Sequence, residues 1–266
     1  MFTSTANQPV RDSAFTVQCR VVHALVLRDL KGRFGGRRLG FLWALVEPLL
    51  FISLFVGMFL LLGRTSQSGV AVPLFFVSGI APFLMFRDLY GTISGEAKGS
   101  SPLLMFPQVS RTDLIVAKLI VNVLLSITVL IVLLSGCYML GYTFSIANPL
   151  GVLRALFLLV VMGLGLGLVI GALVIRYEFI ASISNVILGR PLFLSSGLFF
   201  TADMLPPKAR EYALYNPILH LIESIRTEMF ESFNSRYVDL HYVTVFAIIL
   251  VGFGLMLLQF FDRQRR

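Results

Sequence analysis

Long apolar runs separated by short polar segments dominate this chain of 266 residues. A helix that crosses a bilayer needs about 20 mostly apolar residues, and six runs reach that length. They cover residues 40–62, 72–93, 114–140, 153–175, 179–201 and 241–261. The pattern therefore predicts an all-α integral membrane protein, a single domain over 1–266 with six transmembrane helices and both termini on one side.

Basic residues predict which side that is, because short loops rich in Lys and Arg stay in the cytoplasm. A dense basic segment precedes the first apolar run, and the C-terminal tail is basic as well. The basic residues of the first segment are Arg28, Lys31, Arg33, Arg37 and Arg38. We expect both termini in the cytoplasm and a first transmembrane helix that acts as its own insertion signal.

Residues 15–34 are amphipathic, since Leu27, Leu30 and Phe34 recur at helical spacing among basic side chains. A helix of this kind lies in the plane of the membrane interface. The sequence therefore predicts an N-terminal amphipathic interface helix ahead of the first span.

Small residues mark one face of the run at 153–175. Gly163, Gly167 and Gly171 recur at four-residue steps, with Gly165 between them. Such a face lets another helix approach closely in a membrane. The spacing predicts tight helix packing rather than a dinucleotide site.

The long segment before the last run predicts helices too short to span. Asn216 is a good N-cap, and Pro217 suits the first helical position. Ile218, Ile222, Ile225 and Met229 then recur at helical spacing, and Leu205-Pro206-Pro207 can start a shorter helix ahead. We expect a pair of re-entrant external helices within residues 203–236.

Composition supports a membrane protein. The chain is 57% hydrophobic and 14% charged, with a mean hydropathy of +0.86, which a soluble domain could not carry without large exposed apolar patches. The net charge of +8 lies mainly between and beside apolar runs, where it favours topology and contact with anionic lipid headgroups over nucleic acid. Cys19 and Cys137 alone make neither a disulfide framework nor a metal cage.

Motifs for ATP hydrolysis and for catalysis are absent from the sequence. None of the four lysines follows a glycine, so no phosphate-binding loop is present. The three histidines lie in separate segments, and no metal-binding or nucleophile motif surrounds them. We expect a non-enzymatic chain that binds no cofactor or metal itself and depends on a separate motor.

Two charges lie inside apolar runs. Arg190, near the middle of 179–201, would cost roughly 2.5 to 3.5 kcal/mol in lipid. It either contacts an anionic cargo in a translocation path or pairs internally with an acid such as Glu47. Glu47, about two turns into the first run, is itself either a pathway charge or a structural partner.

Aromatic residues gather near the start of the first run. Trp43, the only tryptophan, lies with Phe41, Phe51 and Phe55. Their faces could stack on sugar rings along a path, but aromatic residues at helix ends also serve as interfacial anchors or packing. Both interpretations remain open.

A cytoplasmic segment carries four apolar residues between two prolines, namely Leu103, Leu104, Met105 and Phe106. Apolar residues outside a span favour a partner surface. We expect residues 98–109 to form a coupling region that fits a groove of a separate ATPase; the alternative is a turn that rests on lipid.

His220, Glu223 and Arg226 stand at i, i+3 and i+6 in the external segment, one loose polar stripe that would be a poor metal site. The stripe is either a solvated or ion-paired face or, together with Asn216, an external gate or adaptor contact.

Several motifs together resemble a known family. They are Arg33-Phe34-Gly35, Arg38-Leu39-Gly40, Leu42-Trp43-Ala44, Glu47-Pro48, Gly189-Arg190-Pro191 and the run Tyr215-Asn216-Pro217-Ile218-Leu219-His220-Leu221-Ile222-Glu223. In these motifs the chain is similar to the permease subunits of bacterial capsular-polysaccharide exporters, which are ABC-2 type transporters. The residues of the motifs resemble capsule export permeases more than O-antigen or teichoic-acid export permeases.

The resemblance implies a homodimer of six-helix permeases, of the ABC-2 or type V exporter kind, in a bacterial inner membrane. It implies two copies of an ABC ATPase that bind ATP and Mg, a lipid-linked and usually acidic polysaccharide as cargo, a periplasmic adaptor and an outer-membrane export protein. The basic residues before the first span would recruit the glycolipid, and the first and fifth spans would line the path.

Two other classes remain as alternatives. A channel or secondary transporter for small ions would use Glu47 and Arg190 as pathway charges. A membrane-bound transferase would need an acidic metal-binding cluster, which the sequence lacks.

Overall fold

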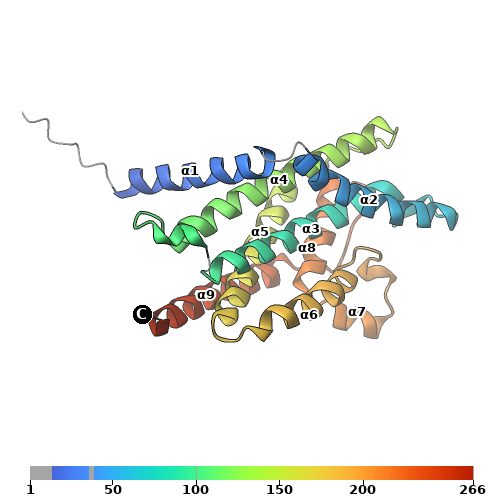
Figure 1. The fold of residues 1–266 in the computed structure, drawn as a ribbon. Coiled ribbons are helices and arrows are strands. Elements are labelled where there is room, and N and C mark those ends of the chain that lie inside the picture. The colour runs from blue at the N-terminus through green and yellow to red at the C-terminus, as the bar shows by residue number, and fades with distance from the viewer. Residues whose placement is uncertain (1–13, 36–38, 100, 266) are drawn as a thin grey trace, which may run out of the picture.

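The structure is a computed structural model. It describes residues 14–35, 39–99 and 101–265, and the side chains of 16–32, 45–99, 101–184, 186, 188–261 and 263. Within these ranges the chain is helical along most of its length, with one short antiparallel hairpin, β1 (Ser66–Gln67) and β2 (Val70–Ala71). The bundle of long helices is seen in Figure 1.

Six of the helices cover the six apolar runs. They are α2 (Leu39–Leu61), α3 (Val72–Ala97), α4 (Arg111–Met139), α5 (Pro149–Arg176), α6 (Phe179–Ser195) and α9 (Leu240–Arg265). Among the described residues, four segments are long and apolar enough to cross a membrane, namely Val72–Met105, Arg111–Met139, Pro149–Arg176 and Leu240–Phe261. Leu45–Leu61 and Phe179–Ser195 are apolar but shorter.

Side-chain caps set where several helices begin. Ser110 and Asp113 form a reciprocal capping box at the start of α4, and the Asn148 side chain accepts a hydrogen bond from the Gly151 N–H at the start of α5. These caps satisfy backbone N–H groups that have no partner in the first turn of a helix. The long helices therefore begin at positions that the local sequence specifies.

Helix α5 lies at the centre of the bundle, packed against α3 and α9. A Cβ added at Gly167 would lie 2.7 Å from Ile93 Cβ, and one at Gly165 would lie 3.0 Å from the Val251 nitrogen. The same face of α5 meets α3 in three steps, at Gly163 on Leu89, Gly167 on Ile93 and Gly171 on Ala97. The predicted close-packing face is confirmed.

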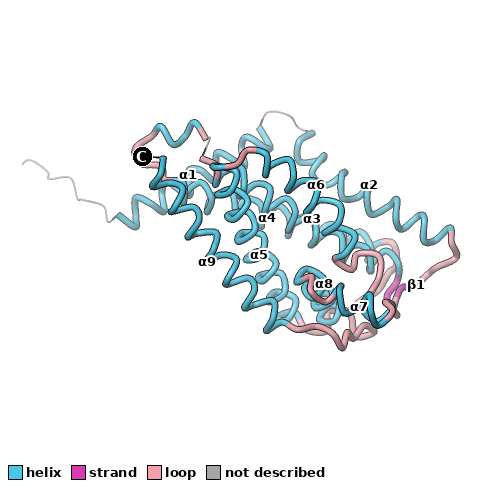
Figure 2. The backbone as a smooth tube through the Cα atoms, turned by 90° about the horizontal axis from the view of Figure 1, so that it is seen from below, coloured by secondary structure: helices cyan, strands magenta, loops and turns pink. Residues whose placement is uncertain are grey.

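The molecule has two distinct ends. The first, which we call the terminal end, carries α1 (Ala14–Gly35), the 3-10 helix η1 (Pro102–Met105) and the C-terminal end of α9 (Figure 1). The second, the hairpin end, carries β1 and β2, the 3-10 helix η2 (Ala202–Met204), α7 (Pro207–Ala213) and α8 (Pro217–Met229). Figure 2 shows β1, α7 and α8 at the same end of the molecule.

Helix α1 packs along the first turns of α4. Gln18 donates a hydrogen bond of 2.8 Å to Asp113, and Lys118 lies 2.8 Å from Asp29. Leu25 is buried with Leu114 between these contacts. The helix predicted over 15–34 is confirmed, and one face of it rests on the bundle.

Candidate functional site

A charged cluster lies on α2 and α3, inside segments that are otherwise apolar. The Arg87 guanidinium lies 3.4 Å from the Glu47 carboxylate and 3.0 Å from that of Asp88. The three side chains are 40%, 56% and 52% exposed, respectively. Charges this exposed are stable within an apolar layer only where water, cargo or a protein partner covers them.

Arg190 does not pair with Glu47. The partner of Glu47 is Arg87, whereas Arg190 is exposed on α6 and makes no ion pair with any side chain that the structure describes. Of the two predicted arrangements, the internal pair with Glu47 is therefore wrong, and contact with cargo stays a prediction. Sequence reasoning missed Arg87, although the adjacent charges Arg87 and Asp88 near the middle of an apolar run were a signal.

Phenylalanine rings connect three helices beside this cluster. Phe193 of α6 contacts Phe51 of α2 at 5.5 Å and Phe83 of α3 at 5.3 Å between ring centroids. Phe55 stacks on Phe76 of α3 at 5.9 Å. Phe51 and Phe55 thus pack inside the chain, and whether they also line a path stays a prediction. The side chains of the other two residues of this set, Phe41 and Trp43, lie outside the described residues.

The predicted recruitment residues are described only in part. Lys31 is exposed, and Arg28 is paired with Asp29 at 2.7 Å. Burial raises the pKa of Asp29, but hydrogen bonds from Lys118 and Arg28 outweigh burial and hold this pKa below its usual value. The side chains of the three remaining basic residues, Arg33, Arg37 and Arg38, lie outside the described residues.

The coupling region is divided between packing and exposure. Leu103 and Leu104 are half-buried against the cluster around Leu25, whereas Met105 and Phe106 are 86% and 61% exposed. The expectation of four exposed apolar side chains is therefore wrong for the first two, because they pack against a cluster formed by α1 and α4. Met105 and Phe106 are the side chains available to a partner.

Helix α8 carries a buried arginine. Arg226 is fully buried, and its guanidinium donates hydrogen bonds of 2.7 Å to the Gly197 carbonyl and 3.2 Å to the Phe75 carbonyl. The guanidinium carbon also lies 3.7 Å above the Phe75 ring. Burial lowers the pKa of Arg226 to about 9, which leaves it protonated at neutral pH. Arg226 joins α8 to the first turn of α3 and to the end of α6.

The rest of the stripe is buried as well. Glu223 accepts hydrogen bonds from the Ala202 N–H and the Ser235 hydroxyl. His220 bonds the Leu214 carbonyl through Nε2 and accepts from the Asp239 N–H through Nδ1, which requires the tautomer with the proton on Nε2. A solvated face is therefore the wrong description, because these side chains point into the protein.

Asn216 caps α8 as the sequence predicted. Its carbonyl oxygen accepts a hydrogen bond of 3.0 Å from the Ile218 N–H, and its amide donates to the hydroxyls of Ser195 and Ser196 at 2.9 and 3.2 Å. The start of α8 is thereby tied to the end of α6. A gating or adaptor role for this segment stays a prediction.

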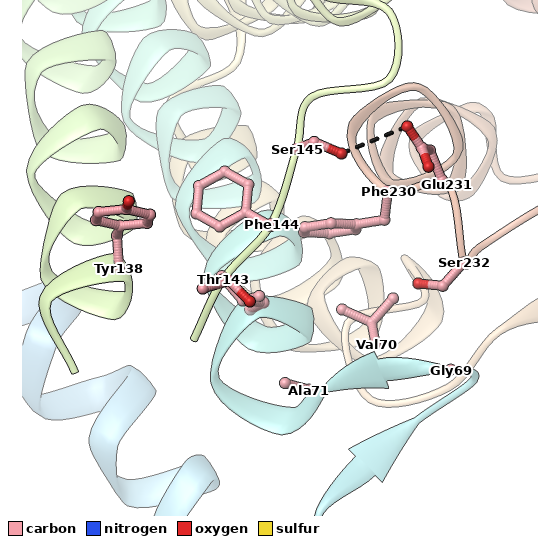
Figure 3. Close-up of a pocket in the computed structure, with 11 residues that line it drawn as sticks. Gly69, Val70, Ala71, Tyr138, Thr143, Phe144, Ser145, Phe230, Glu231 and Ser232 are labelled. Atoms are coloured by element: carbon pink, nitrogen blue, oxygen red, sulfur yellow. Dashed lines mark hydrogen bonds between the residues drawn. The ribbon is translucent and has the colours of Figure 1, made fainter. Parts of the chain in front are cut away.

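A pocket of about 610 Å³ opens at the hairpin end (Figure 3). Tyr138, Phe144 and Phe230 contribute aromatic rings to it, and the Ser145 hydroxyl lies 3.4 Å from the Glu231 carboxylate. The segments that form it come from the hairpin, from the loop between α4 and α5 and from the end of α8. Rings beside hydroxyl groups suit a polar organic molecule or a peptide loop.

The fold and these residues define the class of protein. Exposed ion pairs within long apolar helices are typical of the transmembrane subunits of transport proteins. Among the described residues, no group of three or more His, Cys, Asp or Glu side chains could hold a metal ion. Residues 20–230 match the ABC-2 type transporter family, and the chain belongs to that family.

Curated relatives match the chain over nearly its full length. It is 29% identical to the polysialic acid transport protein KpsM of Escherichia coli, over 92% of this chain and 95% of that protein. It is 30% identical to the capsule polysaccharide export inner-membrane protein CtrC of Neisseria meningitidis serogroup B, over 94% of each. Similarity to the O-antigen export system permease protein RfbA of Klebsiella pneumoniae is lower, at 23% over 86% of this chain and 87% of that protein.

Proposed function

We propose that this chain is the transmembrane permease subunit of an ATP-driven exporter, and that it carries a lipid-linked, acidic capsular polysaccharide across the bacterial inner membrane. The observation that carries the proposal is the match to capsule export proteins over more than nine-tenths of the chain. Membership of the ABC-2 family supports the same function. The cargo of KpsM, polysialic acid by its name, supports an acidic polymer.

The proposed assembly contains two copies of this chain and two copies of an ABC ATPase. Each copy crosses the membrane six times with both termini in the cytoplasm, so the terminal end of the fold faces the ATPase. ATP and Mg bind to the ATPase subunits. The exposed Met105 and Phe106 at the terminal end support this docking side.

In the proposed cycle, the basic residues of α1 and of the segment after it attract the anionic glycolipid to the inner leaflet. ATP binding in the partner then moves η1 and the adjoining α3. The path opens between the two copies, lined by α2 and α6, and Arg190 contacts the anionic polymer. The hairpin end, with α7 and α8, closes the path and meets a periplasmic adaptor that leads to the outer-membrane export protein.

Complementation tests the cargo. The gene is expressed in two strains, one that lacks its capsule export permease and one that lacks its O-antigen export permease, with membrane levels matched by immunoblot. We expect surface capsule to return in the first strain and O-antigen to stay absent in the second. Rescue of O-antigen alone would contradict capsule export.

Co-purification tests the ATPase partner. The wild type is expected to retain an ABC ATPase in mild detergent, and Met105→Asp is expected to lose most of it, because the charge lies on an apolar docking surface. Tyr212→Asp is the matched control, since Tyr212 is 77% exposed on α7 at the opposite end. Equal recovery of the ATPase with both variants would contradict docking at η1.

A further inference from the structure

The three helices α2, α3 and α6 meet at one depth in the bundle. The contacts of the Phe193 ring with Phe51 and Phe83 bring one residue from each helix to the same level. These helices come from distant parts of the chain, so the ring contacts give a common reference along the bundle. The positions of the nearby charges can be compared from this level.

The charges lie on the same side of that level. Helices α2 and α6 run toward the hairpin end, and α3 runs away from it. Glu47 precedes Phe51 by four residues, Arg87 follows Phe83 by four, and Arg190 precedes Phe193 by three. At 1.5 Å per residue these offsets are about 6, 6 and 4.5 Å, all toward the terminal end.

Arg87 is held in one orientation while part of it stays available. Its Nε and Nη2 donate to Asp88 at 3.1 and 3.0 Å, and Nη2 also donates to Glu47 at 3.4 Å. Its Nη1 makes no hydrogen bond with any residue that the structure describes. A guanidinium has five N–H donors, so the two on Nη1, which no described residue accepts, can bond an anion.

From this arrangement we infer that Arg87 and Arg190 form a two-arginine site for an anionic group of the transported polymer, and that Glu47 positions Arg87 rather than touching the cargo. This inference rests on the proposed function. The anionic group is a carboxylate of the sugar chain or the phosphate of its lipid anchor, which share the same chemistry toward a guanidinium.

The two carboxylates beside Arg87 fit this role. Glu47 and Asp88 carry two negative charges beside the single positive charge of Arg87, so the unpaired charge of Arg190 supplies the attraction for an anion and Arg87 adds hydrogen-bond donors. A path that conducts needs contacts strong enough to admit the cargo and weak enough to release it. One arginine flanked by carboxylates and one arginine without a described partner meet that requirement better than two unpaired arginines would.

The test compares wild type with arginine variants, each purified as the complex of this chain with its ATPase in lipid nanodiscs. Stimulation of ATP hydrolysis is measured against the concentration of oligosialic acid, with neutral dextran of similar length as the uncharged probe. For Arg87→Gln and for Arg190→Gln we expect the half-maximal concentration of oligosialic acid to rise about tenfold, since a charged hydrogen bond is lost. Arg154→Gln, at an exposed ion pair with Glu228 at 3.3 Å, is expected to match the wild type.

A charge exchange separates cargo contact from a purely structural pair. The double variant Glu47→Arg with Arg87→Glu keeps the net charge and allows the ion pair to form in reverse. We expect it to reach the membrane at a normal level but to respond to oligosialic acid as weakly as Arg87→Gln. Full recovery would show that only the pair matters and would overturn the site.

Two further arms identify the anion and separate the failures. If free oligosialic acid stimulates ATP hydrolysis by the wild type but not by Arg87→Gln, the anion is the sugar carboxylate. If Arg87→Gln instead lowers ATP hydrolysis only in nanodiscs of anionic phosphatidylglycerol, and not in those of phosphatidylcholine, the anion is a lipid phosphate. If neither oligosialic acid nor phosphatidylglycerol stimulates ATP hydrolysis by the wild type, and the wild type exports no polymer, the proposed function fails. If oligosialic acid stimulates ATP hydrolysis equally in the wild type and in Arg87→Gln, only the two-arginine site is wrong.

Variants of Glu47 test whether this residue positions Arg87. Glu47→Gln is expected to raise the half-maximal concentration of oligosialic acid several-fold, and Glu47→Asp is expected to restore part of the loss because it keeps a carboxylate near Arg87. Equal values for Glu47→Gln and the wild type would contradict a positioning role.

Discussion

Arg226 and Arg190 lie on neighbouring elements of the fold but in opposite surroundings. Arg226 on α8 is fully buried, stacked on Phe75 and bonded to backbone carbonyls. Arg190 on α6 is exposed, and the structure describes no side chain that pairs with it. The guanidinium of the first arginine bonds three backbone carbonyls of the same chain and only its Nε lacks a partner, whereas the second has no described partner.

The difference separates a buried, internally bonded region from an open charged surface. A buried charge is tolerated only where hydrogen bonds and partners replace water, and the hairpin end provides them from α3, α6 and η2. The charged cluster of Glu47, Arg87 and Asp88 is left half-exposed instead. A region whose charges are bonded internally stabilises the fold, and a region with open donors is where a cargo or a second copy is expected to bind.

The largest effect is expected at Arg226. Arg226→Ala removes the donors for several buried carbonyls and should destabilise the chain by about 3 to 5 kcal/mol, measured as thermal unfolding in detergent. Arg154→Ala, at a pair 59% exposed on its arginine side, should cost about 1 kcal/mol or less. Equal melting temperatures for the two variants would show that the buried network adds nothing.

A smaller loss of stability is expected when a substitution crowds the guanidinium of Arg226. A methyl group at Gly79 would overlap the Arg226 guanidinium, so Gly79→Ala should cost about 1 to 3 kcal/mol through overpacking. Gly91→Ala on the same helix is the matched control, since nothing lies within 4 Å of its added Cβ. A melting temperature for Gly79→Ala at or above that of Gly91→Ala would contradict this packing.

A smaller effect on stability is expected at the ion pair between Asp29 of α1 and Lys118 of α4. Because the pKa of Asp29 is below its usual value of 3.8 in the folded chain, its stabilisation is present above about pH 4 to 5 and is lost as the pH falls through the folded pKa. The difference in unfolding free energy between wild type and Asp29→Asn should be about 1 kcal/mol or less at pH 7 and should shrink as the pH falls below the usual value of 3.8. A difference that stays constant as the pH falls through that range and below the folded pKa would contradict the role of the carboxylate charge.

The smallest effect on stability is expected at Arg190. Arg190→Gln removes an exposed charge, so the unfolding free energy should change by about 0.5 kcal/mol or less. Surface polymer in a complemented strain should nevertheless fall strongly if Arg190 contacts the cargo. A large loss of stability would mean that Arg190, like Arg226, is part of the scaffold.

Local features were predictable because neighbouring residues produce them. The start of α8 at Asn216 and Pro217 follows from capping, and the glycine face of α5 follows from four-residue spacing. Both were confirmed at the predicted positions. The helix over residues 15–34 was predictable for the same reason; its place in the membrane interface stays a prediction.

Nonlocal features were not predictable in this way. The stripe of His220, Glu223 and Arg226 was correctly placed on one helix, but its burial depends on Phe75 and Gly197, which lie far away in the sequence. The pairing of Glu47 with Arg87 likewise joins residues 40 positions apart. A single sequence shows which residues share a helix face and does not show what packs against that face.

The sequence by itself determined that the chain is helical, that it belongs in a membrane and where most helices begin, because apolar length and capping act over one helix at a time. Only the tertiary structure decided which charges are buried and which stay open. That outcome depends on which distant backbone carbonyls and carboxylates come within hydrogen-bonding distance. For this protein, that distinction separates Arg226, which is buried against backbone carbonyls, from Arg87 and Arg190, whose guanidinium groups stay exposed.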